Sequence, residues 1–116
     1  MHPWKGATEA LKAAAGQAKL KFVRIDLGKA KDKATLFGEV DRALALPEHF
    51  GHNWDALADV LEDREWLGKA GRVVVLAHAA DYRKDHPTDY GTLEEILGEA
   101  PEFWQARHVP LWVYVA

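Results

Sequence analysis

The chain has 116 residues, of which 48% are hydrophobic and 28% are charged, so its length and composition predict one soluble globular domain. It contains no cysteine, which excludes disulfides, thiolate nucleophiles and cysteine-ligated zinc sites. The formal net charge of -3 is small, but basic residues gather in residues 1–33 and acidic residues in residues 41–65. An acidic surface favours a basic partner, because complementary potentials steer the encounter.

The first residues of the chain do not look like a targeting segment. Residues 1–16 lack the basic start and the uninterrupted apolar run of a signal peptide, and no later run is long enough to span a bilayer. We therefore expect a cytoplasmic protein that does not bind membranes.

The first half of the chain predicts a helix, a strand and a second helix. The alanines in residues 7–15 favour a helix that Gly16 ends. Branched residues in the segment 21–27 favour a strand. From Asp32 onward, apolar residues recur at helical spacing, and Pro47 ends that second helix.

The middle of the chain predicts a loop, a third helix and a buried strand. Residues 47–53 contain proline, glycine and asparagine, which are typical of an ordered loop, and Asn53 is a good cap for the helix that follows. A further turn is expected around Trp66 and Leu67. Residues 73–77 are apolar and mostly branched, as in a strand buried in a parallel sheet.

The last third of the chain predicts a loop, a helix and a final strand. The polar residues 80–91 indicate the loop, and the apolar spacing from Leu93 to Trp104 indicates a helix that Pro101 breaks or kinks. Residues 109–116 are expected to form the final strand. This alternation predicts an α/β fold with a three-stranded parallel sheet and about four helices.

Five large aromatic residues are expected in the core or at its edge. They are Trp66, Phe103, Trp104, Trp112 and Tyr114. Three scattered histidines are expected at the surface or at strand ends: His78, His86 and His108.

The helix after Asn53 has an acidic stripe and an apolar stripe. At about 100° per residue, the acidic stripe holds Asp55, Asp59 and Glu62. The opposite stripe holds Trp54, Leu57, Val60 and Leu61. A solvated acidic face over a packed core is one interpretation of this pattern. A binding face is the other, because Asp59 lies beyond the helix dipole and like charges four apart destabilise a helix by roughly 0.2–0.5 kcal/mol.

The segment 44–63 matches a known family motif in register. The matching residues are Leu44, Ala45, Leu46, Pro47, Glu48, Gly51, Asn53, Asp55, Ala56, Leu57, Asp59 and Leu61, with an aromatic-like pair at 49–50. This stretch resembles the signature of the barstar family of ribonuclease inhibitors. The order of strands and helices is also similar, so the resemblance covers residues 20–116. Residues 1–19 fall outside it and are expected to form an amino-terminal helical extension.

The resemblance implies an inhibitor, without enzymatic activity or cofactor, that plugs the active site of a secreted, barnase-like ribonuclease inside the producing cell. Such a site holds phosphates with basic side chains, and carboxylates on a rigid helix can occupy the same donors. The family pattern implies that Asp59 is the central anchor and that Asp55 is its neighbour. The other implied partner-binding residues are His49, Gly51, Asn53, Trp54, Glu62 and Glu99. It implies no nucleic acid or membrane as a partner and no bound metal.

The chain departs from the family pattern at three positions. Ala58 replaces a large aromatic residue, His49 replaces a tyrosine, and Trp54 is larger than the usual leucine. These changes keep open an alternative within the same class, an immunity or regulatory protein for a different basic toxin or nuclease.

Two alternatives from other classes are weaker. A small metal-dependent enzyme would use His49 and His52 with Asp55 and Asp59, but a ligand set must converge in a cleft and Asp59 lies on the outward stripe. Nucleic-acid binding would use the basic residues 1–33, but no RNA motif is present and the acidic middle of the chain repels phosphate.

Overall fold

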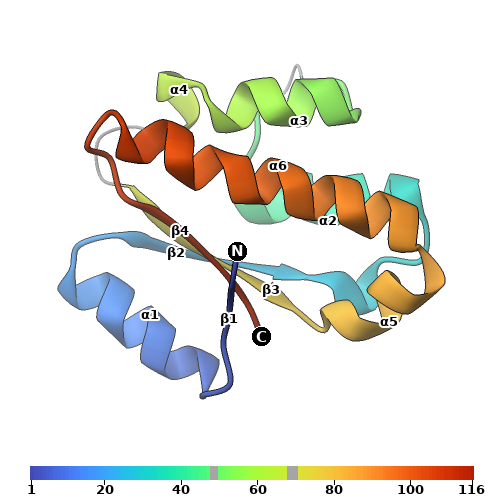
Figure 1. Cartoon of the computed structure of the whole chain (residues 1–116), viewed down its shortest axis with the longest axis horizontal. Coiled ribbons are helices and arrows are strands. Elements are labelled where there is room, and N and C mark those ends of the chain that lie inside the picture. The colour runs from blue at the N-terminus through green and yellow to red at the C-terminus, as the bar shows by residue number, and fades with distance from the viewer. Residues whose placement is uncertain (48–49, 68–70) are drawn as a thin grey trace.

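The computed structural model describes residues 1–47, 50–67 and 71–116, which form one parallel sheet with helices on both faces (Figure 1). The strands are β1 (His2–Pro3), β2 (Lys21–Asp26), β3 (Arg72–Ala77) and β4 (Leu111–Val115), in the spatial order β1-β4-β3-β2. The helices are α1 (Thr8–Gln17), α2 (Lys33–Leu44), α3 (Trp54–Leu61), α4 (Arg64–Leu67), α5 (Ala79–Asp85) and α6 (Pro87–Gln105), with a 3₁₀ turn η1 (Leu27–Lys29). The predicted α/β class and the parallel sheet are confirmed.

The predicted numbers of strands and helices, three and about four, were lower than those in the structure. The additional strand is β1, whose two residues pair with β4 through His2 opposite Tyr114 and Pro3 opposite Val115. A strand of two residues has no detectable alternation in the sequence, because the pattern needs at least four residues to show.

The prediction of a loop over residues 80–91 was wrong, because α5 and the first turn of α6 occupy it. Ala79 and Tyr82 are three residues apart and are both buried, which is the spacing of one helix face. Pro87 is the first residue of α6, a position where its missing N–H costs nothing. Pro101 lies inside α6 and does not break it.

Two helix ends also differ from the prediction. Helix α1 continues through Gly16 to Gln17. Helix α2 ends at Leu44, before Pro47, because Ala45 takes a left-handed conformation with φ of +51°. The start of α2 is as predicted, since the Asp32 carboxylate accepts from the Thr35 N–H at 2.8 Å.

The two faces of the sheet are covered unequally, and Figure 1 shows this as two layers of helices on one side and α1 alone on the other. Helices α2 and α6 cover one face, the front face, and α3 packs on α6 outside them. Trp66 and Trp104 are buried in this core, as predicted. Trp112 is 46% exposed, so the prediction that it lies in the core or at its edge was wrong. None of the described helices combines the length and apolarity needed to cross a membrane.

Candidate partner-binding surface

The turn before α3 is closed by the side chain of Asn53. Its Oδ1 accepts from the Ala56 N–H at 2.8 Å, and its Nδ2 donates to the Gly51 carbonyl oxygen at 3.3 Å. A β-carbon at Gly51 would lie 3.1 Å from Asn53 Nδ2, so a larger residue there would crowd the cap. The predicted start of the helix at Asn53 is confirmed.

The inner side of α3 is fixed to the core by apolar burial and by one indole. Leu57, Val60 and Leu61 are buried. The Trp104 indole N–H, on α6, donates to the Leu61 carbonyl oxygen at 2.6 Å, at the end of α3. This bond satisfies a carbonyl that the helix end leaves unpaired, so α3 is held in one orientation.

A second indole fixes the segment that follows α3. Trp66, on α4, donates its indole N–H to the Leu44 carbonyl oxygen at 2.9 Å. The buried Arg72 guanidinium lies 4.6 Å from the centre of the Trp66 ring and donates to the Trp66 carbonyl oxygen. Burial lowers the pKa of Arg72. These contacts join α4 to both α2 and β3.

The outward side of α3 is acidic and exposed. Asp55, Asp59 and Glu62 all face solvent. Within residues 1–47, 50–67 and 71–116, no ion pair neutralises any of the three. Their charges are therefore available to a basic partner, and a fixed helix presents them without reorganisation.

Aromatic side chains fill the angle between α2 and the start of α3. The ring of Phe37, on α2, lies 4.7 Å from the Trp54 ring and 6.1 Å from the Phe50 ring, measured between centroids. Lys33 Nζ lies 5.7 Å from the centre of the Trp54 ring. Trp54 is consequently half-buried and leans on α2 rather than standing free.

His52 is also tied to α2. Its Nε2 lies 3.0 Å from Asp41 Oδ2, and its ring stacks on Phe37 at 6.3 Å with an interplanar angle of 22°. The carboxylate only accepts, so the imidazole Nε2–H is the donor. The turn is thus held on α2 by one hydrogen bond and by ring packing.

Comparison with known protein families identifies the family to which this helix and the chain around it belong. A family model described as barstar (barnase inhibitor) matches residues 20–116. The chain belongs to the barstar family. No curated protein matches it.

The family match confirms the resemblance over the residues predicted for it. Barstar-family proteins are inhibitors and not enzymes. Residues 1–19, which contain β1 and α1, lie outside the match. Their division from residues 20–116 as an extension remains a prediction.

Most of the predicted partner-binding residues lie together. Those on α3 or in the turn before it are Gly51, Asn53, Trp54, Asp55 and Asp59, and Glu62 is the C-cap of α3. Glu99 is exposed on α6, the helix that packs against α3. No hydrogen bond or ion pair joins Glu99 to α3 in the described part of the chain. His49 lies outside the described residues.

Sequence reasoning missed the residues that support this barstar-family surface. Asp41 and Phe37 lie on α2, and nothing in their local spacing points to the turn before α3. Trp104 was expected in the core, but its bond to the end of α3 depends on two segments more than forty residues apart. Only the folded chain brings these side chains to the helix.

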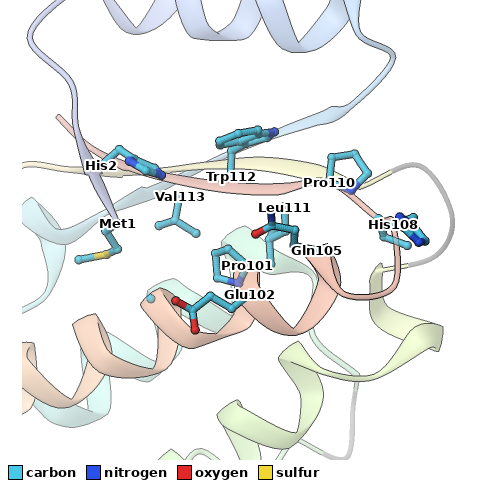
Figure 2. A pocket seen from close by; sticks show the side chains of 12 residues that line it. Met1, His2, Pro101, Glu102, Gln105, His108, Pro110, Leu111, Trp112 and Val113 are labelled. Carbon is cyan, nitrogen blue, oxygen red and sulfur yellow. The ribbon is translucent and has the colours of Figure 1, made fainter.

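An open hollow lies elsewhere, between α6 and β4 (Figure 2). Its volume is about 630 Å³, and Pro101, Glu102, Leu111 and Val113 are among its lining residues. None of the predicted partner-binding residues lines it. In Figure 2 the Trp112 ring stands on the side of the strand away from α6.

The metal-enzyme alternative gains no support from the described residues. Among residues 1–47, 50–67 and 71–116, no group of three or more histidine or carboxylate side chains is arranged to hold a metal ion. The His52 side chain bonds to Asp41, and His49 lies outside the described residues.

Proposed function

We propose that the chain is an intracellular inhibitor of a barnase-like ribonuclease and that it blocks the nuclease active site with α3 and the turn before it. Family membership supports the class of partner. The observation that carries the proposal is a set of three exposed carboxylates along α3 and its C-cap, none of them ion-paired to another described residue, on a helix whose start and end are both fixed.

The acidic stripe supplies what the active site of a ribonuclease is built to bind. Such a site holds phosphate groups with arginine, lysine and histidine side chains, and a carboxylate accepts the same charge-assisted hydrogen bonds. In this proposal Asp59 is the central anchor, Asp55 contacts the partner one turn earlier, and Glu62 extends the stripe. Because α3 is already ordered, little conformational entropy is lost on binding.

The turn and the neighbouring helix complete the proposed contact surface. Gly51 and Asn53 shape the turn, and Trp54 supports the first residues of α3 from the side of α2. His49 and Glu99 are the remaining proposed contacts. Glu99 would meet the partner from α6, beyond the stripe on α3.

The proposal places the inhibitor in the cytoplasm, where it protects the cell that makes the nuclease before secretion. It needs no cofactor, since a stoichiometric inhibitor acts by occupying the site rather than by chemistry.

The first test is a titration of the purified protein into a barnase-like ribonuclease from the same organism. We expect stoichiometric inhibition by the wild type. Asp59→Ala should raise the inhibition constant by about two to three and a half orders of magnitude, since leaving a buried basic group unpaired costs roughly 3–5 kcal/mol. Asp55→Ala should have a smaller effect, because the adjacent anchor remains.

The matched control is Asp81→Ala, which removes an exposed acid from the first turn of α5. It should leave the inhibition constant unchanged. Circular dichroism and thermal unfolding establish that each variant is folded. Equal inhibition by wild type, Asp55→Ala and Asp59→Ala would move the interface away from α3 and contradict the proposed mechanism.

A second candidate keeps the same surface but changes the partner to a different basic toxin or nuclease. Ala58 favours it, because this half-buried residue puts only a methyl group between Asp55 and Glu62, where the family resemblance implies a large aromatic. A partner that binds an acidic stripe with a methyl group at position 58 needs a differently shaped surface from one that accommodates an aromatic ring there. Inhibition of such a toxin, without inhibition of any barnase-like ribonuclease, would establish this candidate.

A further inference from the structure

The turn between α2 and α3 contains a residue in an unfavourable backbone conformation. His52 has φ of +50°, in the left-handed region that residues with a β-carbon rarely adopt. Such a conformation persists only where the surrounding structure holds it. The contacts of His52 therefore have to account for the shape of the turn.

Three contacts hold His52, and all of them come from residues already fixed. Its Nε2–H donates to Asp41 Oδ2 at 3.0 Å. Its ring stacks on Phe37 at 6.3 Å and lies 5.0 Å from the Phe50 ring. Phe37 and Phe50 are both buried, so the imidazole rests on the core while half of it, 51%, stays exposed.

The same turn determines where α3 begins. His52 stands between Gly51 and Asn53, whose side chain caps the helix through the Ala56 N–H. The direction in which the chain leaves His52 sets the position of Asn53 and hence of Asp55 in the first turn of α3.

We propose that the His52–Asp41 hydrogen bond is a clasp that orders this turn before the partner arrives and thereby positions α3 for binding. His52 is a positioning residue in this account, and it acts through Asn53 rather than through its own contact with the partner. The inference rests on the proposed function of α3. It adds to that function a hydrogen bond that affects affinity although neither of its residues belongs to the acidic stripe.

An ordered turn matters for affinity because only the ordered form is competent to bind. The apparent dissociation constant equals the intrinsic one divided by the populated fraction of competent protein. Opening the clasp lets the turn leave the left-handed conformation and lowers that fraction.

The chain supplies a matched control for this clasp. His78 also has a positive φ, +56°, and its Nδ1 lies 2.9 Å from Asp26 Oδ1. This second histidine–aspartate pair is at the ends of β2 and β3, beside η1 and α5. It has the same chemistry and similar exposure but does not belong to the proposed binding surface.

The test compares Asp41→Ala with Asp26→Ala in two measurements. The first is amide hydrogen exchange of the Ala56 N–H in the free protein, and the second is the inhibition constant against the ribonuclease. We expect Asp41→Ala to speed Ala56 exchange and to raise the inhibition constant, each by about fivefold to tenfold, as for the loss of one partly exposed charge-assisted hydrogen bond. Asp26→Ala should change neither quantity.

Two variants of His52 separate positioning from general stability. His52→Gly adopts a positive φ without strain, so the fold is kept, but the ring and its hydrogen bond are lost. We expect an unchanged unfolding midpoint and a raised inhibition constant. His52→Gln keeps a donor within reach of Asp41 and should restore part of the affinity.

Each outcome decides the proposal. Unchanged Ala56 exchange in Asp41→Ala, or an equal rise of the inhibition constant in Asp26→Ala, overturns it. Faster exchange together with unchanged inhibition also overturns the positioning role. If the wild type inhibits no ribonuclease, the proposed function fails, and Ala56 exchange alone then decides whether the clasp orders the turn.

Discussion

The two faces of the sheet differ in the number of helix layers that cover them and in the part of the chain that supplies those helices. The front face is covered by α2 and α6, with α3 packed outside α6. Its buried strand residues are Val23, Ile25, Val74, Leu76, Leu111 and Val113. The back face is covered by α1, whose Leu11 and Ala15 are buried, and β4 leaves Trp112 exposed on that side.

The proposed binding surface therefore lies on the front side of the sheet, and α1 covers the back face. Helix α3 and its supports, Trp104 and Asp41, belong to the front layers and lie within the residues that match the family. Helix α1 lies outside that match. Loss of a front support should therefore affect both stability and inhibition, whereas loss of a back contact should affect stability alone.

The largest effect is expected at the indole that holds the end of α3. Trp104→Ala removes a fully buried side chain and its bond to the Leu61 carbonyl, so the free energy of unfolding should fall by about 3–5 kcal/mol. Trp104→Phe removes mainly the hydrogen bond and should cost about 1–3 kcal/mol. Urea denaturation measures both, and the inhibition constant should rise in the folded Trp104→Phe variant because α3 is less firmly oriented.

The control for this prediction is Trp112→Ala, the same substitution at an exposed tryptophan on the back face. It should change the unfolding free energy by no more than about 0.5–1 kcal/mol and should not change inhibition. Equal destabilisation by Trp104→Ala and Trp112→Ala would contradict the distinction between the faces.

A smaller effect is expected from the back face. Leu11→Ala removes a buried side chain from α1, and the unfolding free energy should fall by about 2–3 kcal/mol. Inhibition measured below the unfolding transition should equal that of the wild type. A raised inhibition constant in the folded Leu11→Ala variant would show that the two faces are coupled, and it would also weaken the prediction that residues 1–19 are an extension.

Much of the front face and of the acidic helix could be predicted because their signals are local. Asn53 and the stripe of Asp55, Asp59 and Glu62 lie within ten residues, so helix start, direction and charge all follow from spacing. The apolar run of β3 likewise predicts a strand buried on both faces, and all six of its residues are buried.

The remainder depends on contacts between distant segments. Asp41 and His52 are eleven residues apart on different elements, and the left-handed turn that brings them together has no glycine at position 52 to mark it. Helix α5 was missed because its charged residues dominate a seven-residue segment in which only Ala79 and Tyr82 are buried. Trp112 was predicted in the core or at its edge because a strand pattern does not reveal that one face is left partly uncovered.

The smallest effect is expected from acid, through two carboxylates on either side of η1, Asp26 and Asp32. The hydrogen bond from His78 holds the pKa of Asp26 below its ordinary value of 3.8. The backbone N–H of Thr35 at the start of α2 likewise holds the pKa of Asp32 below 3.8. A carboxyl group with a lowered pKa in the folded state contributes stability above its unfolded pKa and loses it as the pH falls through the folded pKa.

Stability should therefore be constant with respect to these two groups near neutral pH and should decline once the pH falls below about 4. Urea unfolding at pH 6, 4 and 3 measures the decline. Asp32→Asn should flatten it, because the variant has no carboxylate to protonate at the cap of α2, whereas Glu9→Gln in α1 should leave the profile unchanged. If Asp32→Asn and Glu9→Gln change the profile equally, the acid response does not arise from the cap of α2, and Asp32 contributes no more to it than the exposed acid of α1 does.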